Sequence, residues 1–147
     1  MSEQRATGTT AARRRIPCVG AVLTDDRGRL LLVRRANEPG RGLWSVPGGR
    51  VEPGETPARA VVREVVEETG LAVVVTGLAG VVERAAPSGE VYVIEDHTAR
   101  LAAGVDPESA RAGDDALDVA WMPVEDLDEV PCVEGLLDAL RGWGCLA

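Results

Sequence analysis

The chain has 147 residues and a net charge of −8, and 45% of its residues are hydrophobic although none is Phe. This length fits one compact domain, which must have an aliphatic core. The acidic balance argues against general affinity for DNA or RNA, which requires a basic surface, and no apolar run approaches the roughly 18 residues of a membrane span.

The first 15 residues are polar and lack both periodicity and the apolar run of a signal peptide. We therefore expect a disordered tail over 1–15, a single domain over 16–147 and a cytoplasmic location. The three cysteines, at 18, 132 and 145, lack CxxC spacing. They indicate neither a disulfide framework nor a zinc site.

The first half of the chain predicts a hairpin, a shaped loop and a helix. Residues 16–24 and 29–35 are β-rich and enclose a turn sequence, so they predict a hairpin. A Gly/Pro-rich loop then leads to a predicted short strand over 50–52. Thr56 as N-cap, Pro57 at the first helical position and Gly70 after the last turn predict a helix over 57–69.

The second half of the chain is predicted to be mostly strands. The expected strands are 71–76, 78–84, 91–101 and 117–122, with a turn at 86–90 between the second and third. An acidic, Gly-rich loop occupies 103–116. The chain closes with a single helical turn at 124–128 and an amphipathic helix over 133–143.

The predicted helix over 57–69 carries an acidic cluster. At 100° of rotation per residue, Glu64, Glu67 and Glu68 project toward the same side. Their repulsion weakens an isolated helix by a few tenths of a kcal/mol per pair, and Arg63 cannot neutralise them all. Mg²⁺, which binds carboxylates together with water and phosphate oxygens, would offset this repulsion. For an arbitrary helix the alternative is a solvated charged face.

The residues around this cluster form a longer pattern. From Gly49 the chain reads GRVEPGETPARAVVREVVEETGL. This is the full signature of the Nudix hydrolase family, with no departure at any defined position. The resemblance extends upstream through Arg34, Arg35 and GLWSVPGG, and downstream through AGDDA and Trp121. It covers roughly residues 16–142.

The resemblance implies a fold and a metal-dependent reaction. Nudix proteins share an α/β/α sandwich around a mixed sheet, so we expect an α+β fold of that type. The implied reaction is hydrolysis of a diphosphate bond with Mg²⁺, or Mn²⁺ in its place. The implied metal ligands are Glu64, Glu67, Glu68 and the main-chain carbonyl of Gly49, and Arg63 and Glu55 would orient them.

The general base and the substrate contacts are less sharply defined. The family places its base on the signature helix or on a later loop, which here means Glu64, or Asp115 or its neighbour Asp114. The alternative is that these two aspartates are only a turn before a strand. The candidates for substrate binding are Arg34, Arg35, Arg50 and Trp44.

These four residues carry different expectations. The three arginines can hold phosphates through bidentate contacts, although one of Arg34 and Arg35 must point away because neighbouring strand residues face opposite sides. Trp44 either stacks on a base or fills the core, and the core is favoured. His97 is expected to be a strand residue rather than a catalyst.

The predicted substrate is ADP-ribose, which would yield AMP and ribose 5-phosphate. The run RRANEPGRGLWSVPGGRVEPGE is similar to small ADP-ribose pyrophosphatases, and Pro87 lies 16 residues after Leu71, where that subgroup tends to carry a proline. The alternatives are a pyrophosphohydrolase for oxidised dNTPs and a sensor that binds a nucleotide without hydrolysis. No signature carboxylate is lost, which favours catalysis. We expect a small nucleotide as partner, with no nucleic acid polymer and no membrane. The sequence does not decide between a monomer and a homodimer.

Overall fold

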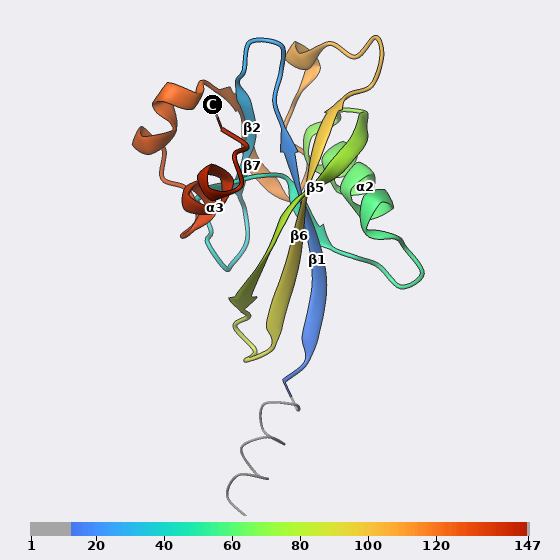
Figure 1. The fold of residues 1–147 in the computed structure, drawn as a ribbon, viewed down its shortest axis with the longest axis vertical. Helices are drawn as coiled ribbons and strands as arrows, with labels where there is room; N and C mark the ends of the chain where they lie inside the picture. The colour runs from blue at the N-terminus through green and yellow to red at the C-terminus, as the bar shows by residue number, and fades with distance from the viewer. Residues whose placement is uncertain (1–12, 147) are drawn as a thin grey trace, which may run out of the picture.

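The computed structural model describes residues 13–146 (Figure 1). Residues 1–12 of the tail predicted over 1–15 lie outside the described residues. The first strand begins at Arg15. The elements are β1 (Arg15–Leu23), β2 (Leu30–Arg35), β3 (Trp44–Ser45), β4 (Gly48–Arg50), α2 (Pro57–Thr69), β5 (Val73–Ala85), β6 (Val91–Leu101), a 3₁₀ turn η1 (Pro107–Ser109), β7 (Ala116–Met122), a 3₁₀ helix η2 (Val124–Glu129) and α3 (Leu136–Gly142).

Two sheets form the centre of the molecule. The larger has the order β4-β1-β6-β5, with β1 parallel to β6 and the other pairs antiparallel, and the smaller has the order β3-β2-β7. Helix α2 lies on one side of the larger sheet, and α3 lies on the other (Figure 1). The predicted α+β architecture, a mixed sheet between helical layers, is confirmed.

The predicted hairpin over residues 16–35 is wrong in its pairing. Both strands exist and the turn forms, since Asp25 Oδ1 accepts hydrogen bonds from the backbone N–H groups of Arg27 and Arg29. However, β1 pairs with β4 and β6, whereas β2 pairs with β3 and β7, and only one bridge, Thr24 to Leu30, joins the two segments. The two strands still share both cores, because Leu31 is buried with Leu23, and Leu30 and Leu32 are buried with Val22.

Glycine explains two further differences from the predicted strands. The strands expected at 71–76 and 78–84 form one strand, β5, whose register shifts near Gly77 and Gly80. The strand expected at 50–52 lies two residues earlier as β4. Gly48 allows this close pairing because an added Cβ would overlap the backbone carbonyl of Val19.

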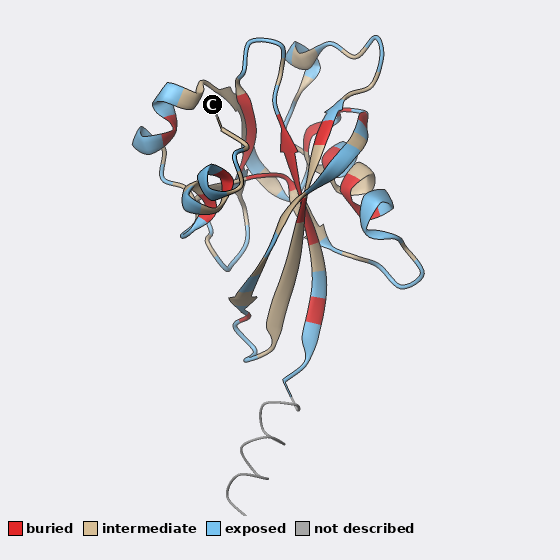
Figure 2. Cartoon of the chain, viewed as in Figure 1, coloured by how far each residue is buried: buried red, intermediate tan, exposed pale blue. Residues whose placement is uncertain are grey.

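Helix α2 has the predicted bounds. The Thr56 hydroxyl accepts a hydrogen bond from the Arg59 N–H, and Gly70 ends the helix with a φ of 75°. The helix is rich in β-branched valines, so packing must hold it. Its buried residues, Ala60, Val61, Val65 and Thr69, are fully covered against the larger sheet (Figure 2).

Thr56→Ala is expected to lower the free energy of unfolding by about 1 kcal/mol. The hydroxyl satisfies one of the otherwise unpaired N–H groups of the first turn, and Ala removes that acceptor. Urea unfolding measures the change, and Thr56→Ser, which keeps the hydroxyl, is the matched control. An equal loss in both variants would contradict the capping role.

The C-terminal part forms a second core. Helix α3 begins three residues later than predicted, after Gly135, which has a φ of 81°. Its Leu136 and Leu140 are buried with Leu30, Leu32 and Leu127, whereas Leu137 is half-buried. Within residues 13–146 no helix is both long and apolar enough to cross a membrane.

Candidate active site

The carboxylates of α2 meet the short edge strand β4. Glu68 Oε1 accepts a hydrogen bond of 2.9 Å from the Gly48 N–H. Beside it, Gly49 leaves room for the Glu64 carboxylate, because an added Cβ at Gly49 would overlap that group. The glycines of β4 therefore let two glutamates lie directly against the backbone of the sheet edge.

Burial disfavours the charged forms of these two glutamates. It raises the pKa of Glu68 to about 7, and the charge of Glu64 contributes further, while the hydrogen bond from Gly48 acts in the opposite direction. The pKa of Glu64 is also raised, mainly by burial and against the effect of Arg63. Two half-buried carboxylates that repel each other are a suitable binding place for a cation.

Arg63 connects the helix to the loop before it. Its Nε and Nη2 bind the two oxygens of Glu55 at 2.7 and 2.9 Å, and Nη2 also donates to the Arg50 carbonyl at 3.0 Å. Its Nη1 lies 2.9 Å from Glu67 Oε1 and 3.1 Å from Glu64 Oε2. The guanidinium and the Glu52 N–H lower the pKa of Glu55 to about 2. Arg63 thus ties Glu55 and the Arg50 carbonyl to the helix, and the predicted role of Arg63 and Glu55 in orienting metal ligands stays a prediction.

Glu67 differs from the other two signature carboxylates. Its side chain is 52% exposed and turns toward Arg63. Within residues 13–146, no three His, Cys, Asp or Glu side chains lie close enough together to hold a metal ion. Glu64 and Glu68 alone still fit Mg²⁺, which commonly uses one or two carboxylates and takes its other ligands from water and substrate phosphates.

The loop before β7 docks on the C-terminal end of α2. The N–H groups of Arg111 and Gly113 donate to the carbonyls of Thr69 and Glu68 at 3.0 and 2.9 Å. Gly113 lies so close to the helix that an added Cβ would overlap the Glu67 carbonyl. Asp115 is exposed, and its charge raises the pKa of Glu68. Asp115 is therefore within electrostatic range of Glu68, and its role as a base stays a prediction.

A cavity of about 750 Å³ opens on the face of the larger sheet away from α2. Arg35 and Arg50 line it, whereas Arg34 does not. Arg34 is exposed and donates to the Gly42 carbonyl, and Arg35 donates to the Pro39 carbonyl at 2.6 Å. The two neighbouring arginines thus point in different directions, as the strand geometry predicts.

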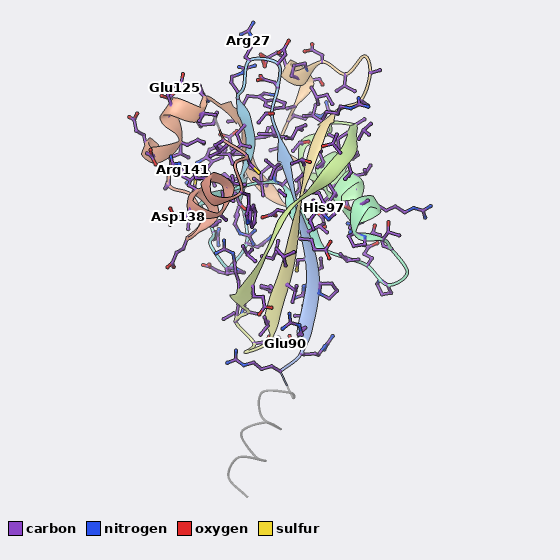
Figure 3. The ribbon with its side chains drawn as sticks, in the orientation of Figure 1. Arg27, Glu90, His97, Glu125, Asp138 and Arg141 are labelled. Atoms are coloured by element: carbon purple, nitrogen blue, oxygen red, sulfur yellow. The ribbon has the colours of Figure 1, made fainter. Side chains whose placement is uncertain are left out.

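The two remaining residues singled out in the sequence lie outside the cavity lining. The Trp44 side chain packs against the second core, and the Trp44 backbone N–H donates to the Pro131 carbonyl. His97 lies on β6 (Figure 3), with Nε2 3.2 Å from Glu95 Oε1. These positions agree with the core interpretation of Trp44 and the strand interpretation of His97.

Sequence reasoning missed several residues of the cavity. Cys18, Tyr92 and Asp96 line it, and the Arg50 guanidinium lies 5.7 Å from the centroid of the Tyr92 ring. They meet because β1 and β6 are parallel neighbours although about 75 residues separate them. The alternation along 91–101 could have identified Tyr92 and Asp96 as sharing one face, but not the cavity they line.

Comparison with known proteins shows that this chain is similar to Nudix proteins. A family model described as the NUDIX domain matches residues 14–140. The human 8-oxo-dGDP phosphatase NUDT18 is 39% identical over 103 residues, which are 70% of this chain and 31% of that protein. An ADP-ribose pyrophosphatase of Methanocaldococcus jannaschii is 38% identical over 104 residues, which are 69% of this chain and 59% of that protein.

A solved structure shares the fold as well. A MutT Nudix hydrolase from Burkholderia pseudomallei superposes with a TM-score of 0.75 at 31% identity, over 88% of this chain and 98% of that one. By contrast, the chain spans only about a third of the length of the human relative and three fifths of the archaeal one.

Proposed function

This chain belongs to the Nudix hydrolase family, and from that membership we propose that it hydrolyses the diphosphate bond of a nucleoside diphosphate derivative with the help of a divalent cation. The observation that carries the proposal is the pair Glu64 and Glu68, half-buried against the glycine edge of β4. The pair lies next to a cavity large enough for a nucleotide and lined by two arginines.

Four groups are proposed to hold the cation. They are the Glu64 and Glu68 carboxylates, the Gly49 carbonyl and, as a further ligand, Glu67. Nudix proteins typically use a divalent metal, and the all-oxygen donor set suits Mg²⁺ or Mn²⁺. When bound, the cation would polarise phosphoryl oxygens and neutralise the charge that develops on them.

The protein groups then orient the substrate and accept a proton. Arg35 and Arg50 line the cavity and are proposed to bind phosphate oxygens, whereas Arg34 and Trp44 are not among the lining residues. Water attacks phosphorus and the bond to the bridging oxygen breaks, which releases a nucleoside monophosphate and the phosphorylated remainder. Glu64 or Asp115 is proposed to take the proton from the attacking water.

Two substrates are candidates. The sequence favours ADP-ribose, and the archaeal relative named as an ADP-ribose pyrophosphatase supports it. The position of Pro87 is weaker support for ADP-ribose, because a proline also suits the tight turn between β5 and β6 in which Pro87 lies. The second candidate is an oxidised guanine nucleotide, which the human relative named as an 8-oxo-dGDP phosphatase supports.

A product-release panel tests the proposal. Purified protein with Mg²⁺ is assayed against ADP-ribose, NADH, sugar nucleotides, diadenosine polyphosphates and oxidised dNTPs. We expect one purine nucleotide to be cleaved at least about tenfold faster than the others, activity to be lost in EDTA and restored by Mg²⁺ or Mn²⁺. Binding without hydrolysis would favour the sensor alternative, and full activity in EDTA would contradict the metal assignment.

A further inference from the structure

An unpaired carboxyl group lies at the cavity. Asp96 on β6 is 4% exposed and lines the cavity, and its Oδ1 has no hydrogen-bond partner within residues 13–146. It is the only buried side-chain oxygen or nitrogen of the described chain in this state. Buried carboxyl groups are normally hydrogen-bonded, so this one requires an explanation.

The basic residues nearest to Asp96 are bound elsewhere. Arg84 and His97 both lower its pKa through their charge, yet Arg84 donates to the Glu134 carbonyl and His97 lies against Glu95. The neighbour on β1 is Gly20, where an added Cβ would overlap Asp96 Oδ1. The fold therefore makes room for the carboxyl group without supplying a donor to Oδ1. Because Oδ1 is closed to solvent, a donor on a ligand reaches it only when the carboxyl group turns toward the cavity that Asp96 lines.

The position of Asp96 fits the base of a bound nucleotide. Gly20 pairs with Asp96 on one side and with Gly48 on the other, and the Gly48 N–H binds Glu68. Asp96 is thus two strand spacings, about 10 Å, from the strand that carries the proposed metal site. The ribose and the purine ring together can span this separation, so a nucleotide with its phosphates at Glu68 can bring the donor edge of its base to Asp96.

The chemistry of a carboxylate selects among bases. An ionised carboxylate only accepts hydrogen bonds, so it pairs best with two adjacent N–H donors. Guanine offers N1–H beside the N2 amino group, whereas adenine and cytosine offer one amino group beside a ring acceptor that would face the second oxygen. Burial raises the pKa of Asp96 to about 6, which leaves the group mainly ionised at pH 7.5.

We propose that Asp96 is a specificity-determining residue that binds the N1–H and N2 amino donors of a guanine base, in a plain or an oxidised guanine nucleotide. The inference rests on the proposed function, because that function places the phosphates at β4. It favours the guanine nucleotides over ADP-ribose as substrate. Because 8-oxoguanine keeps both donors, Asp96 recognises guanine with or without the oxidation.

Binding of nucleoside monophosphates tests the inference separately from catalysis, because these ligands contain no diphosphate bond. Calorimetry with Mg²⁺ compares GMP, IMP and AMP on the unaltered protein. We expect GMP to bind about 10–100-fold more tightly than AMP, and IMP, which lacks the N2 amino group, to lie between them. Equal binding of GMP and AMP, tighter binding of AMP, or IMP equal to GMP would overturn the inference.

Asp96→Asn gives the complementary test, because the amide presents a donor where the carboxylate presents an acceptor. We expect GMP binding to weaken about 10–100-fold while AMP binding changes less than about threefold. Asp138→Asn is the matched control, since Asp138 is exposed on α3 (Figure 3). An equal change for GMP and AMP would show that Asp96 is only structural. If the variant does not fold, the ligand series on the unaltered protein decides.

The two proposals fail in different ways. Guanine-selective binding without hydrolysis of any diphosphate would contradict the proposed function and leave the role of Asp96 standing. Metal-dependent hydrolysis with equal binding of GMP and AMP would contradict only the role of Asp96.

Discussion

Replacing Glu68 with Gln is expected to lower kcat by about 10²–10⁴-fold while the fold survives. Glutamine keeps an oxygen that can accept the hydrogen bond from Gly48, so the contact between α2 and β4 remains. It removes the negative charge that is proposed to hold the divalent cation. The loss should therefore fall on metal binding and turnover rather than on structure.

The stability of the metal-free variant gives a second readout. The pKa of Glu68 is raised to about 7 in the folded protein, so its ionisation destabilises the fold as the pH rises from about 4.5 through 7. Above that range Glu68→Gln should match or exceed the unaltered protein in Tm. A variant that unfolds at lower temperature at pH 8 would show that Glu68 is held mainly for structure.

Glu64→Gln should behave similarly, and a distant glutamate provides the control. Glu125 lies on η2, on the far side of the molecule from α2 (Figure 3), and Glu125→Gln should leave kcat within about twofold. Steady-state rates are measured over a Mg²⁺ series. Near-normal Mg²⁺-dependent rates in both signature variants would refute the assignment of the site.

The features predicted correctly from the sequence are those whose signals are local. Thr56, Pro57 and Gly70 lie within a few residues of the helix ends that they define, and α2 has the predicted bounds. The pairing of strands is not local, because β1 takes its parallel partner from the other half of the chain. The turn after Leu23 is compatible with a hairpin, and tertiary packing determined that its strands entered different sheets.

The residues of the candidate site likewise fall into a group with a local sequence signal and a group without one. Arg63, Glu64 and Glu68 belong to one contiguous signature, so the sequence identifies them together. Asp96 and Tyr92 carry no motif, and they join the cavity only through the pairing of β6 with β1. The sequence therefore indicates the proposed chemistry more readily than the recognition of the base, which depends on long-range packing.

The second large effect is expected at Arg63. One guanidinium binds Glu55 through two hydrogen bonds, contacts Glu64 and Glu67, and holds the carbonyl of Arg50. Arg63→Ala should leave these acceptors without their donor and lower the free energy of unfolding by about 1–3 kcal/mol. Because the Arg50 carbonyl and Glu55 would lose this connection to α2, metal affinity and kcat/KM should also fall about 10–100-fold.

Arg63→Lys separates charge from geometry. Lysine keeps the positive charge, but a single ammonium group cannot replace a planar fork that reaches Glu55, Glu67 and the Arg50 carbonyl together. We therefore expect the Lys variant to recover less than half of the lost unfolding free energy, and Arg59→Ala, an exposed arginine on the same helix, to have little effect. Full recovery by lysine, measured by urea unfolding and by a Mg²⁺ titration of the rate, would mean that Arg63 acts only by neutralising the acidic cluster. The fork geometry predicts instead that stability and metal affinity fall together, because the same five contacts hold the loop and orient the carboxylates.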